Sequence, residues 1–412
     1  MSIPTEQRRT PIPRDEKLPQ IAQLLDAEAM KSFLARSLGR DELPGGVQIR
    51  YLRYRHGTNL VVHYETEIDG VGRHAVSVTS SKHDLSGEPA RPEHRERATR
   101  VESRTPGTPF SYLPELQALV YWLPFDPDLP ALSGAPASLR ARLEAAGVEV
   151  TAADGEPLLL QYRPRRRATL RLGRHVVKIY RYDDDYADGT RGLQASALVG
   201  SVRTARGEAF VPEWRLTVQE LLPGNPPARR ADAARDAGAV LAALHASTID
   251  GLPPHLPADR LQGVAESVRL VAAVAPALAE RAESLLRRLE AEAPDPDILV
   301  ASHGDFHGGQ LLHLAAGEYA VIDFDLLAAA APALDVANYA GHLVAQEGLD
   351  VTAAASVVDA LSDGYGKRPP GLPWYLSAAI LRSCRGPFKR FEPDWPDRIE
   401  STLGAAEAAH AL

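Results

Sequence analysis

The chain has very little cysteine and no long hydrophobic run. Cys384 is the single cysteine among its 412 residues, which excludes an internal disulfide bond and is typical of a reducing compartment. No stretch approaches the ~18 consecutive apolar residues of a membrane span, and residues 1–20 lack the apolar core of a signal peptide. We therefore expect a cytoplasmic protein that makes no membrane contact.

A basic excess is also missing. The formal net charge of −8 keeps the chain soluble and argues against broad binding of nucleic acid. With 412 residues, of which 44% are hydrophobic, the chain can bury more than one core, so two or three domains are expected. Cys384 lies in a stretch with a helical pattern and is interpreted as a buried structural thiol rather than a nucleophile.

Strand patterns fill the first half of the chain. Residues 47–70 and 72–81 alternate β-branched or aromatic side chains with polar ones, and the Ile-Asp-Gly at the end of the first segment marks a hairpin turn, so strands are predicted here. Residues 84–109 are rich in proline, glycine and charged residues and predict a loop. The segments 52–62 and 160–172 each follow the pattern strand, basic turn, strand, which indicates a duplicated hairpin unit.

The second half is mainly helical in pattern. Helices are predicted at residues 137–147 and 191–202 and over most of the chain from 226 onward, whereas Asp183 to Asp185 are interpreted as a solvated acidic turn. A hairpin with its turn at Gly317 interrupts the helices. The expected fold is therefore α+β, with an N-terminal arm and β-rich cap (1–130), a β-rich lobe (131–224) and a helical lobe (225–412).

Two short motifs in the helical half carry chemistry. They are HGDFHGGQ at 303–310 and IDFD at 322–325. Because a tight hairpin brings the start of its first strand close to the end of its second, Gln310 and Asp323 are predicted to face each other, with Asp305 nearby. Two carboxylates and an amide oxygen are hard ligands that suit Mg²⁺. The spacing D-x4-Q followed by D-F-D parallels the kinase catalytic loop (D-x4-N) and metal loop (D-F-G).

These motifs, continued by ALDVANY, resemble the signature of the aminoglycoside phosphotransferase/choline kinase-like superfamily. The resemblance implies a bilobal protein-kinase-like fold, use of ATP and Mg²⁺, and phosphorylation of an alcohol group. It implies that Asp305 is the catalytic aspartate, that Asp323 and Gln310 hold the metal, and that Asp335 is the aspartate of the following helix. Gln310 departs from the commoner asparagine and is similar to the glutamine of maltokinase-like enzymes, which also carry an N-terminal cap.

The resemblance places the nucleotide upstream of the motifs. Lys178, on an apolar strand, is expected to bind the phosphates of ATP. Gln194 stands on the next helix, where these folds normally have the glutamate partner of that lysine, and Glu208 is a distant substitute. The backbone from Glu220 to Leu222 is expected to meet adenine.

The loop at the place of a glycine-rich phosphate loop contains no glycine. Its sequence, YRPRRRATL, offers Arg163 and Arg165, with Arg166 and Arg167, as candidate phosphate ligands. Two other interpretations stay open. The arginines form a solvated basic turn, or they contact an acidic or phosphorylated substrate.

The histidines of the first motif suggest a competing interpretation. His303 and His307 are spaced like zinc ligands, but no third soft ligand lies nearby and the motif lacks the glutamate of H-E-x-x-H. His303 is interpreted as a brace of the loop and His245 as a buried structural histidine. Asp325, in place of the D-F-G glycine, is either a second metal or substrate contact or a helix-side cap. Asp335 is expected to accept hydrogen bonds from the loop backbone.

The leading hypothesis is an ATP- and Mg²⁺-dependent kinase that phosphorylates a hydroxyl of a small molecule, such as a sugar or an aminoglycoside. One alternative is a Ser/Thr kinase that acts on a precursor peptide in lanthipeptide-like biosynthesis, with a partner lyase. Another is a nucleotide-binding pseudokinase, because the glutamate partner of Lys178 and the glycine-rich loop are missing. The acceptor itself does not follow from the sequence.

Overall fold

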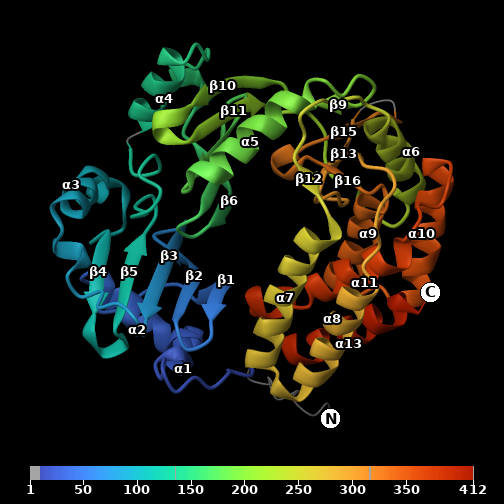
Figure 1. The fold of residues 1–412 in the computed structure, drawn as a ribbon. Helices are drawn as coiled ribbons and strands as arrows, with labels where there is room; N and C mark the ends of the chain where they lie inside the picture. Colours follow the sequence, from blue (N-terminus) through green and yellow to red (C-terminus); the bar gives the residue numbers. More distant parts are fainter. Residues whose placement is uncertain (1–9, 135, 315–316, 412) are drawn as a thin grey trace, which may run out of the picture.

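The computed structural model describes residues 10–134, 136–314 and 317–411. Two five-stranded sheets come first in the chain and a helical region follows, so that the blue-to-green part of Figure 1 is rich in strands and the yellow-to-red part in helices. This arrangement confirms the predicted α+β class. Within the described ranges, none of the helices combines the length and the apolar character needed to cross a bilayer.

The first sheet is antiparallel, with the strand order β1-β2-β3-β5-β4. Its strands are β1 (Val47–Arg55), β2 (Asn59–Ile68), β3 (Val71–Ser80), β4 (Phe110–Leu113) and β5 (Ala118–Trp122). Helices α1 (Ile21–Leu24) and α2 (Ala27–Ser37) cover one face, where Leu60, Val62 and Trp122 are buried in the same core as Leu34. Because side chains alternate along a strand, the neighbouring positions Val61 and Val78 lie on the opposite face.

The second sheet is also antiparallel, with the order β10-β11-β8-β7-β6. Its strands are β6 (Leu158–Arg163), β7 (Arg167–Leu172), β8 (His175–Tyr180), β10 (Gly207–Val211) and β11 (Leu216–Glu220). Helix α4 (Pro136–Ala145) precedes it, and helix α5 (Asp183–Ser196) connects β8 to the last strands. Leu143 of α4 is buried with Leu170, Val177 and Val218 of the sheet.

The two sheets have the same topology. In each, a helix precedes three antiparallel strands, a second helix follows (α3, Pro92–Val101, or α5), and a final hairpin pairs its last strand with the third strand. Both final hairpins turn through Pro-Glu and then a residue with left-handed backbone, Gln117 (φ 43°) or Arg215 (φ 47°). The predicted duplication of one hairpin therefore extends over a whole lobe.

The strand pairing sets equivalent positions in the two sheets. Lys178 pairs with Thr169 and Thr217 in the second sheet. Counting from the turns, the same place in the first sheet belongs to Val78, which pairs with Val61 and Leu119. The first lobe therefore repeats the architecture of the second but has an apolar residue where the second has its buried lysine.

The helical region contains eight helices in the described ranges: α6 (Ala234–His245), α7 (Pro257–Val274), α8 (Ala279–Ala291), α9 (Ala333–His342), α10 (Val351–Tyr365), α11 (Leu372–Ser383), α12 (Gly386–Lys389) and α13 (Trp395–His410). Two small sheets join them, β12 (Pro254–His255) with β16 (Ala328–Ala330) and β13 (Val300–Ser302), and β14 (Leu311–His313) with β15 (Tyr319–Val321) and β9 (Arg203–Thr204). Since β9 belongs to the second lobe, its pairing with β15 connects that lobe to the helical region.

Some local predictions were wrong. The predicted loop at 84–109 contains helix α3, whose buried residues His94 and Val101 are hidden among exposed charges. Asp183 to Asp185 are exposed, as predicted, but they form the first turn of α5 rather than a separate acidic turn, and acidic side chains there are favoured by the helix dipole. This helix ends at Ser196, short of the predicted end at 202, and the hairpin of β4 and β5 was not predicted.

Candidate active site

The backbone of the first motif donates hydrogen bonds to a buried aspartate. Asp335, at the start of α9, accepts hydrogen bonds from the backbone N–H groups of His303 (2.7 Å) and Gly304 (2.9 Å). His245 bonds the same carboxylate at 3.1 Å. Burial raises the pKa of Asp335, but the bonds from His245 and the loop outweigh it and lower that pKa overall. The expected structural roles of Asp335 and His245 are confirmed.

His303 and Gly304 give the loop its shape. The His303 Nε2 atom donates to the Ile322 carbonyl at 2.9 Å, which ties the first motif to the second and confirms the brace. Gly304 has a positive φ of 84°, and a Cβ there would lie 2.2 Å from the Leu326 carbonyl oxygen. No other residue fits this position without a shift of the backbone.

Asp305 follows directly and points toward the cleft between the lobes. Its Oδ1 atom accepts from Arg382 Nη2 of α11 at 3.0 Å, and its side chain is 39% exposed. Asn338 of α9 donates to the Gly304 carbonyl (3.0 Å) and accepts from Arg260 (2.6 Å). Arg382, Asn338 and Arg260 were not predicted, because they lie on helices distant in sequence from the motif.

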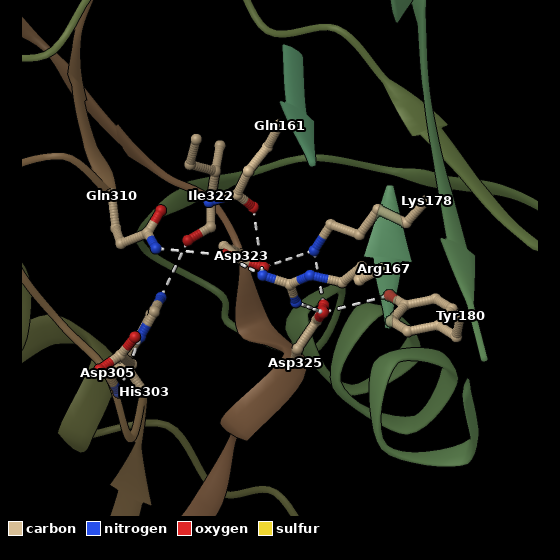
Figure 2. A network of polar contacts seen from close by, with 10 residues as sticks. All are labelled: Gln161, Arg167, Lys178, Tyr180, His303, Asp305, Gln310, Ile322, Asp323 and Asp325. Carbon is tan, nitrogen blue, oxygen red and sulfur yellow. Dashed lines mark hydrogen bonds and ion pairs between the residues drawn. The ribbon is translucent and has the colours of Figure 1, made fainter. Parts of the chain in front are cut away.

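The second motif meets the second sheet in a compact polar cluster (Figure 2). Lys178 Nζ donates to Asp323 Oδ1 and to Asp325 Oδ1, both at 2.5 Å. Gln310 Nε2 donates to the other oxygen of Asp323 at 3.1 Å, so Gln310 and Asp323 face each other across the hairpin. Arg167 Nη1 reaches Asp325 Oδ2 at 2.6 Å. Asp305 lines the same cleft, which has a volume of about 190 Å³.

Charge balance keeps this cluster ionised. Burial raises the pKa of Asp323, but Lys178 and Arg167 together hold it well below its usual range. Burial would lower the pKa of Lys178, whereas Asp323 and Asp325 raise it above its usual range. Lys178 and Asp323 are therefore both charged at neutral pH, which is the state needed to bind phosphate and metal.

Asp325 is the acidic partner of Lys178 that the sequence did not reveal. The predicted partner, Gln194, is exposed on α5 and forms no hydrogen bond with Lys178 among the described side chains. The suggested substitute, Glu208, bonds His175 at 2.5 Å instead. Of the two alternatives considered for Asp325, a metal or substrate contact and a cap, neither includes this ion pair. Asp325 also accepts from the Tyr180 hydroxyl at 3.1 Å.

The donor set is suited to magnesium. Asp323 offers carboxylate oxygens and Gln310 an amide oxygen, which are hard ligands. In the structure the Nε2 atom of Gln310 faces Asp323, so the amide has to turn for its oxygen to meet a metal held by Asp323. Among the described residues, no group of three or more His, Cys, Asp or Glu side chains could hold a metal ion by itself. This fits Mg²⁺, which commonly binds through one or two carboxylates and the phosphates of its substrate. Zinc has no such support, because His307 stacks on His342 with ring centroids 4.1 Å apart.

The segment from Glu220 to Leu222, which is predicted to meet adenine, lies beside an apolar cluster. Leu222 is buried in an apolar cluster with Ala205, Leu312 and Ala320, between the second lobe and the β14–β15 hairpin. The side chain of Glu220 is bonded to Arg203. The backbone segment that we expect to meet adenine therefore lies next to buried apolar packing.

Of the two predicted phosphate ligands, Arg163 lines the catalytic cleft and Arg165 does not. Arg165, with a positive φ of 60°, is bonded to Asp128 of the N-terminal region, and its backbone N–H donates to Asp126 at 2.9 Å. Arg165 therefore anchors the turn to the first lobe. Arg163 and Arg166 line the catalytic cleft, together with Arg167.

The part of the chain that contains the two motifs of this site is similar to a family of phosphotransferases. The family model described as "Phosphotransferase enzyme family" (APH) matches residues 190–375, which include both motifs, and this confirms the predicted resemblance. No curated protein sequence matches the chain.

Several solved structures have a similar arrangement. A choline/ethanolamine kinase family protein from Mesorhizobium loti is 14% identical, with 67% of this chain and 95% of that chain covered and a TM-score of 0.47. A choline kinase from Streptococcus pneumoniae is 13% identical, with 66% of this chain and 98% of that chain covered and a TM-score of 0.48. A macrolide 2'-phosphotransferase from Brachybacterium faecium is 22% identical, with 65% of this chain and 97% of that chain covered and a TM-score of 0.41.

Proposed function

We propose that this protein transfers the γ-phosphate of ATP to a hydroxyl group of a small molecule. The observation that carries the proposal is one cleft lined by Asp305 and Asp323, with Lys178 and Gln310 both bonded to Asp323. A phosphate-binding lysine, a metal-binding pair and a candidate base then lie within reach of one substrate. The match of residues 190–375 to a phosphotransferase family supports the same reaction.

Each residue has a defined task. Lys178 binds the nucleotide phosphates, and the apolar walls around Leu222 hold adenine. Mg²⁺, held by Asp323 and Gln310 when bound, neutralises charge on the phosphates. Asp305 orients the acceptor hydroxyl and takes its proton as the new bond to the γ-phosphorus forms and the bond to the β–γ bridging oxygen breaks. Arg382 keeps the Asp305 carboxylate in place.

The ion pair of Lys178 with Asp325 favours turnover over the pseudokinase alternative. The missing helical glutamate was the main support for a protein that binds nucleotide without catalysis. Asp325 supplies a carboxylate at 2.5 Å from the lysine, so the lysine is oriented without that glutamate.

The test is ATP consumption measured across a panel of sugars, sugar phosphates, aminoglycosides and peptides, with Asp305→Asn as the blank. General base catalysis contributes about 10²–10⁴-fold, so the variant should lose at least about a hundredfold in kcat on whichever acceptor is found. Thermal unfolding shows whether the variant remains folded. A folded Asp305→Asn variant with full activity would contradict the role of Asp305.

A further inference from the structure

A second and much larger cleft opens beside the catalytic one. Its volume is about 1680 Å³, and its walls come from the first sheet, the turn between β6 and β7, helix α7 and the region of α12. Arg163 and Arg166 line both clefts, so a molecule bound in the large cleft can extend to Asp305. In Figure 1 the first sheet and helix α7 lie on opposite sides of the gap between the ribbons.

The large cleft is strongly basic in a protein whose net charge is −8. Twelve arginines and lysines line it, against four aspartates and glutamates. Three of those four carboxylates already pair with arginines of the wall, as Asp128 does with Arg165 and Arg181. Eight of the twelve cations form no ion pair with any described side chain, and four of these eight lie close enough to influence one another: Arg53, Arg163, Arg166 and Lys389.

These four cations act on one another. Burial, and then repulsion from Arg385, Arg163, Arg166 and Arg53, lower the pKa of Lys389 to about 7. Its Nζ atom lies 5.3 Å from the ring centre of Tyr51. Burial also lowers the pKa of Arg53, and Arg166 contributes to that shift. Such a group of cations lacks a counter-charge, and an anion bound among them would supply it.

The duplicated lobe explains why a ligand site lies here. Val61, Val78 and Leu119 line the large cleft. Their equivalents in the second sheet are Thr169, Lys178 and Thr217, on the face that carries the phosphate-binding lysine. The first lobe therefore turns its corresponding face toward a cleft, but without a lysine at the centre of the sheet. A second ATP site is not built here, and the charges come instead from the rim.

We propose that the large cleft binds the phosphate groups of a phosphorylated acceptor, which reaches Asp305 with its free hydroxyl. This inference rests on the proposed function and narrows its substrate class. Three or four converging cations match a phosphate dianion better than a single carboxylate, and arginines bind phosphate oxygens in pairs. The same charges repel polycationic acceptors such as aminoglycosides.

The proposal is tested by equilibrium binding, which does not depend on phosphoryl transfer. Isothermal titration at constant ionic strength, with Mg²⁺ and a non-hydrolysable ATP analogue at saturation, compares fructose 1,6-bisphosphate with fructose. We expect binding of the bisphosphate alone, equally by the wild type and Asp305→Asn. Arg53→Ala and Lys389→Met should each weaken it by about tenfold, the loss typical of one charge-assisted hydrogen bond.

Arg287→Ala is the matched control, since Arg287 is exposed on α8 and lies outside the cleft. It should leave binding unchanged, and thermal unfolding identifies any variant that is misfolded. Equal binding of fructose and its bisphosphate, or an equal loss in Arg287→Ala, overturns the proposal. So does tighter binding of a hexaglutamate peptide than of the bisphosphate, which would assign the cleft to an acidic peptide. A kinase that fails to turn over any acceptor while still binding the bisphosphate refutes only the proposed function.

Discussion

Val78 and Lys178 occupy equivalent positions in two sheets of the same topology, yet their surroundings differ. Lys178 is bonded to Asp323 and Asp325 of the helical region and takes part in the candidate active site. Val78 is buried in an apolar cluster with Val76 and Tyr121. The sheet is thus a scaffold in both lobes, and chemistry depends on whether a neighbouring segment supplies carboxylates.

The turns at the ends of the sheets show the same divergence. The left-handed position in the turn between β1 and β2 is Gly57 (φ 61°), which adopts it without strain. The equivalent position between β6 and β7 is Arg165 (φ 60°), whose backbone and side chain are bonded to Asp126 and Asp128. The second lobe therefore accepts a less favourable backbone in return for a link to the first.

The largest expected effect comes from Lys178→Met, which is compared with the same substitution at the equivalent residue, Val78→Met. Lys178→Met should lower kcat by about 10²–10³-fold, the usual loss when one charge-stabilising donor is removed. Val78 lies in the wall of the large cleft and away from the nucleotide site, so Val78→Met should change kcat/KM for ATP less than twofold at saturating acceptor, and it should cost about 1–3 kcal/mol of stability through overpacking. Steady-state kinetics and thermal unfolding measure both. Similar kinetic losses in the two variants would show that the first lobe also takes part in catalysis.

Asp325→Asn is expected to have the next largest effect. It removes the charge of the partner that orients Lys178 but keeps the size of the side chain. We expect kcat/KM for ATP to fall by about tenfold, because a hydrogen bond to a charged group contributes about 1.5–3 kcal/mol. Asp325→Glu should recover part of the loss. A normal KM and kcat in Asp325→Asn would show that Asp323 alone is enough to orient Lys178.

The sequence predicted the parts of the site that are close together in the chain. Asp305, Gln310 and Asp323 lie in one loop and one hairpin, so spacing alone brought Gln310 against Asp323. Arg382 could not be found this way, because it is 77 residues from Asp305 and reaches it through helix packing. The partner of Lys178 was missed for the same reason, since Asp325 is 147 residues away.

The fold shows a similar limit. Hairpins with a glycine turn and long amphipathic helices were predicted because their pattern is local. In the sequence, the duplication of the lobe was visible in only one hairpin. The remaining strands are equivalent in their pairing register but not similar in sequence. Helix α3 was missed because only His94 and Val101 of its ten residues are buried.

The pH dependence of stability is expected to be a smaller effect. Asp323 has a pKa below its usual range, so its charge stabilises the fold above the unfolded-state pKa of about 3.9. That contribution is lost as pH falls below about 4 toward the folded-state pKa. The Tm of the wild type should therefore drop more between pH 5 and pH 3 than that of Asp323→Asn. Asp232→Asn, on an exposed side chain, should follow the wild type.

The smallest expected effect belongs to Gln194→Glu. This change restores a glutamate at the position where the kinase resemblance expects the partner of Lys178. In the structure Gln194 is exposed on α5, and Lys178 is already bonded to two carboxylates. We therefore expect less than a twofold change in kcat or KM for ATP, and no rescue when Gln194→Glu is combined with Asp325→Asn. A rescue in that double variant would mean that α5 rotates toward Lys178 during catalysis and that Lys178 can pair with residue 194 in a second arrangement.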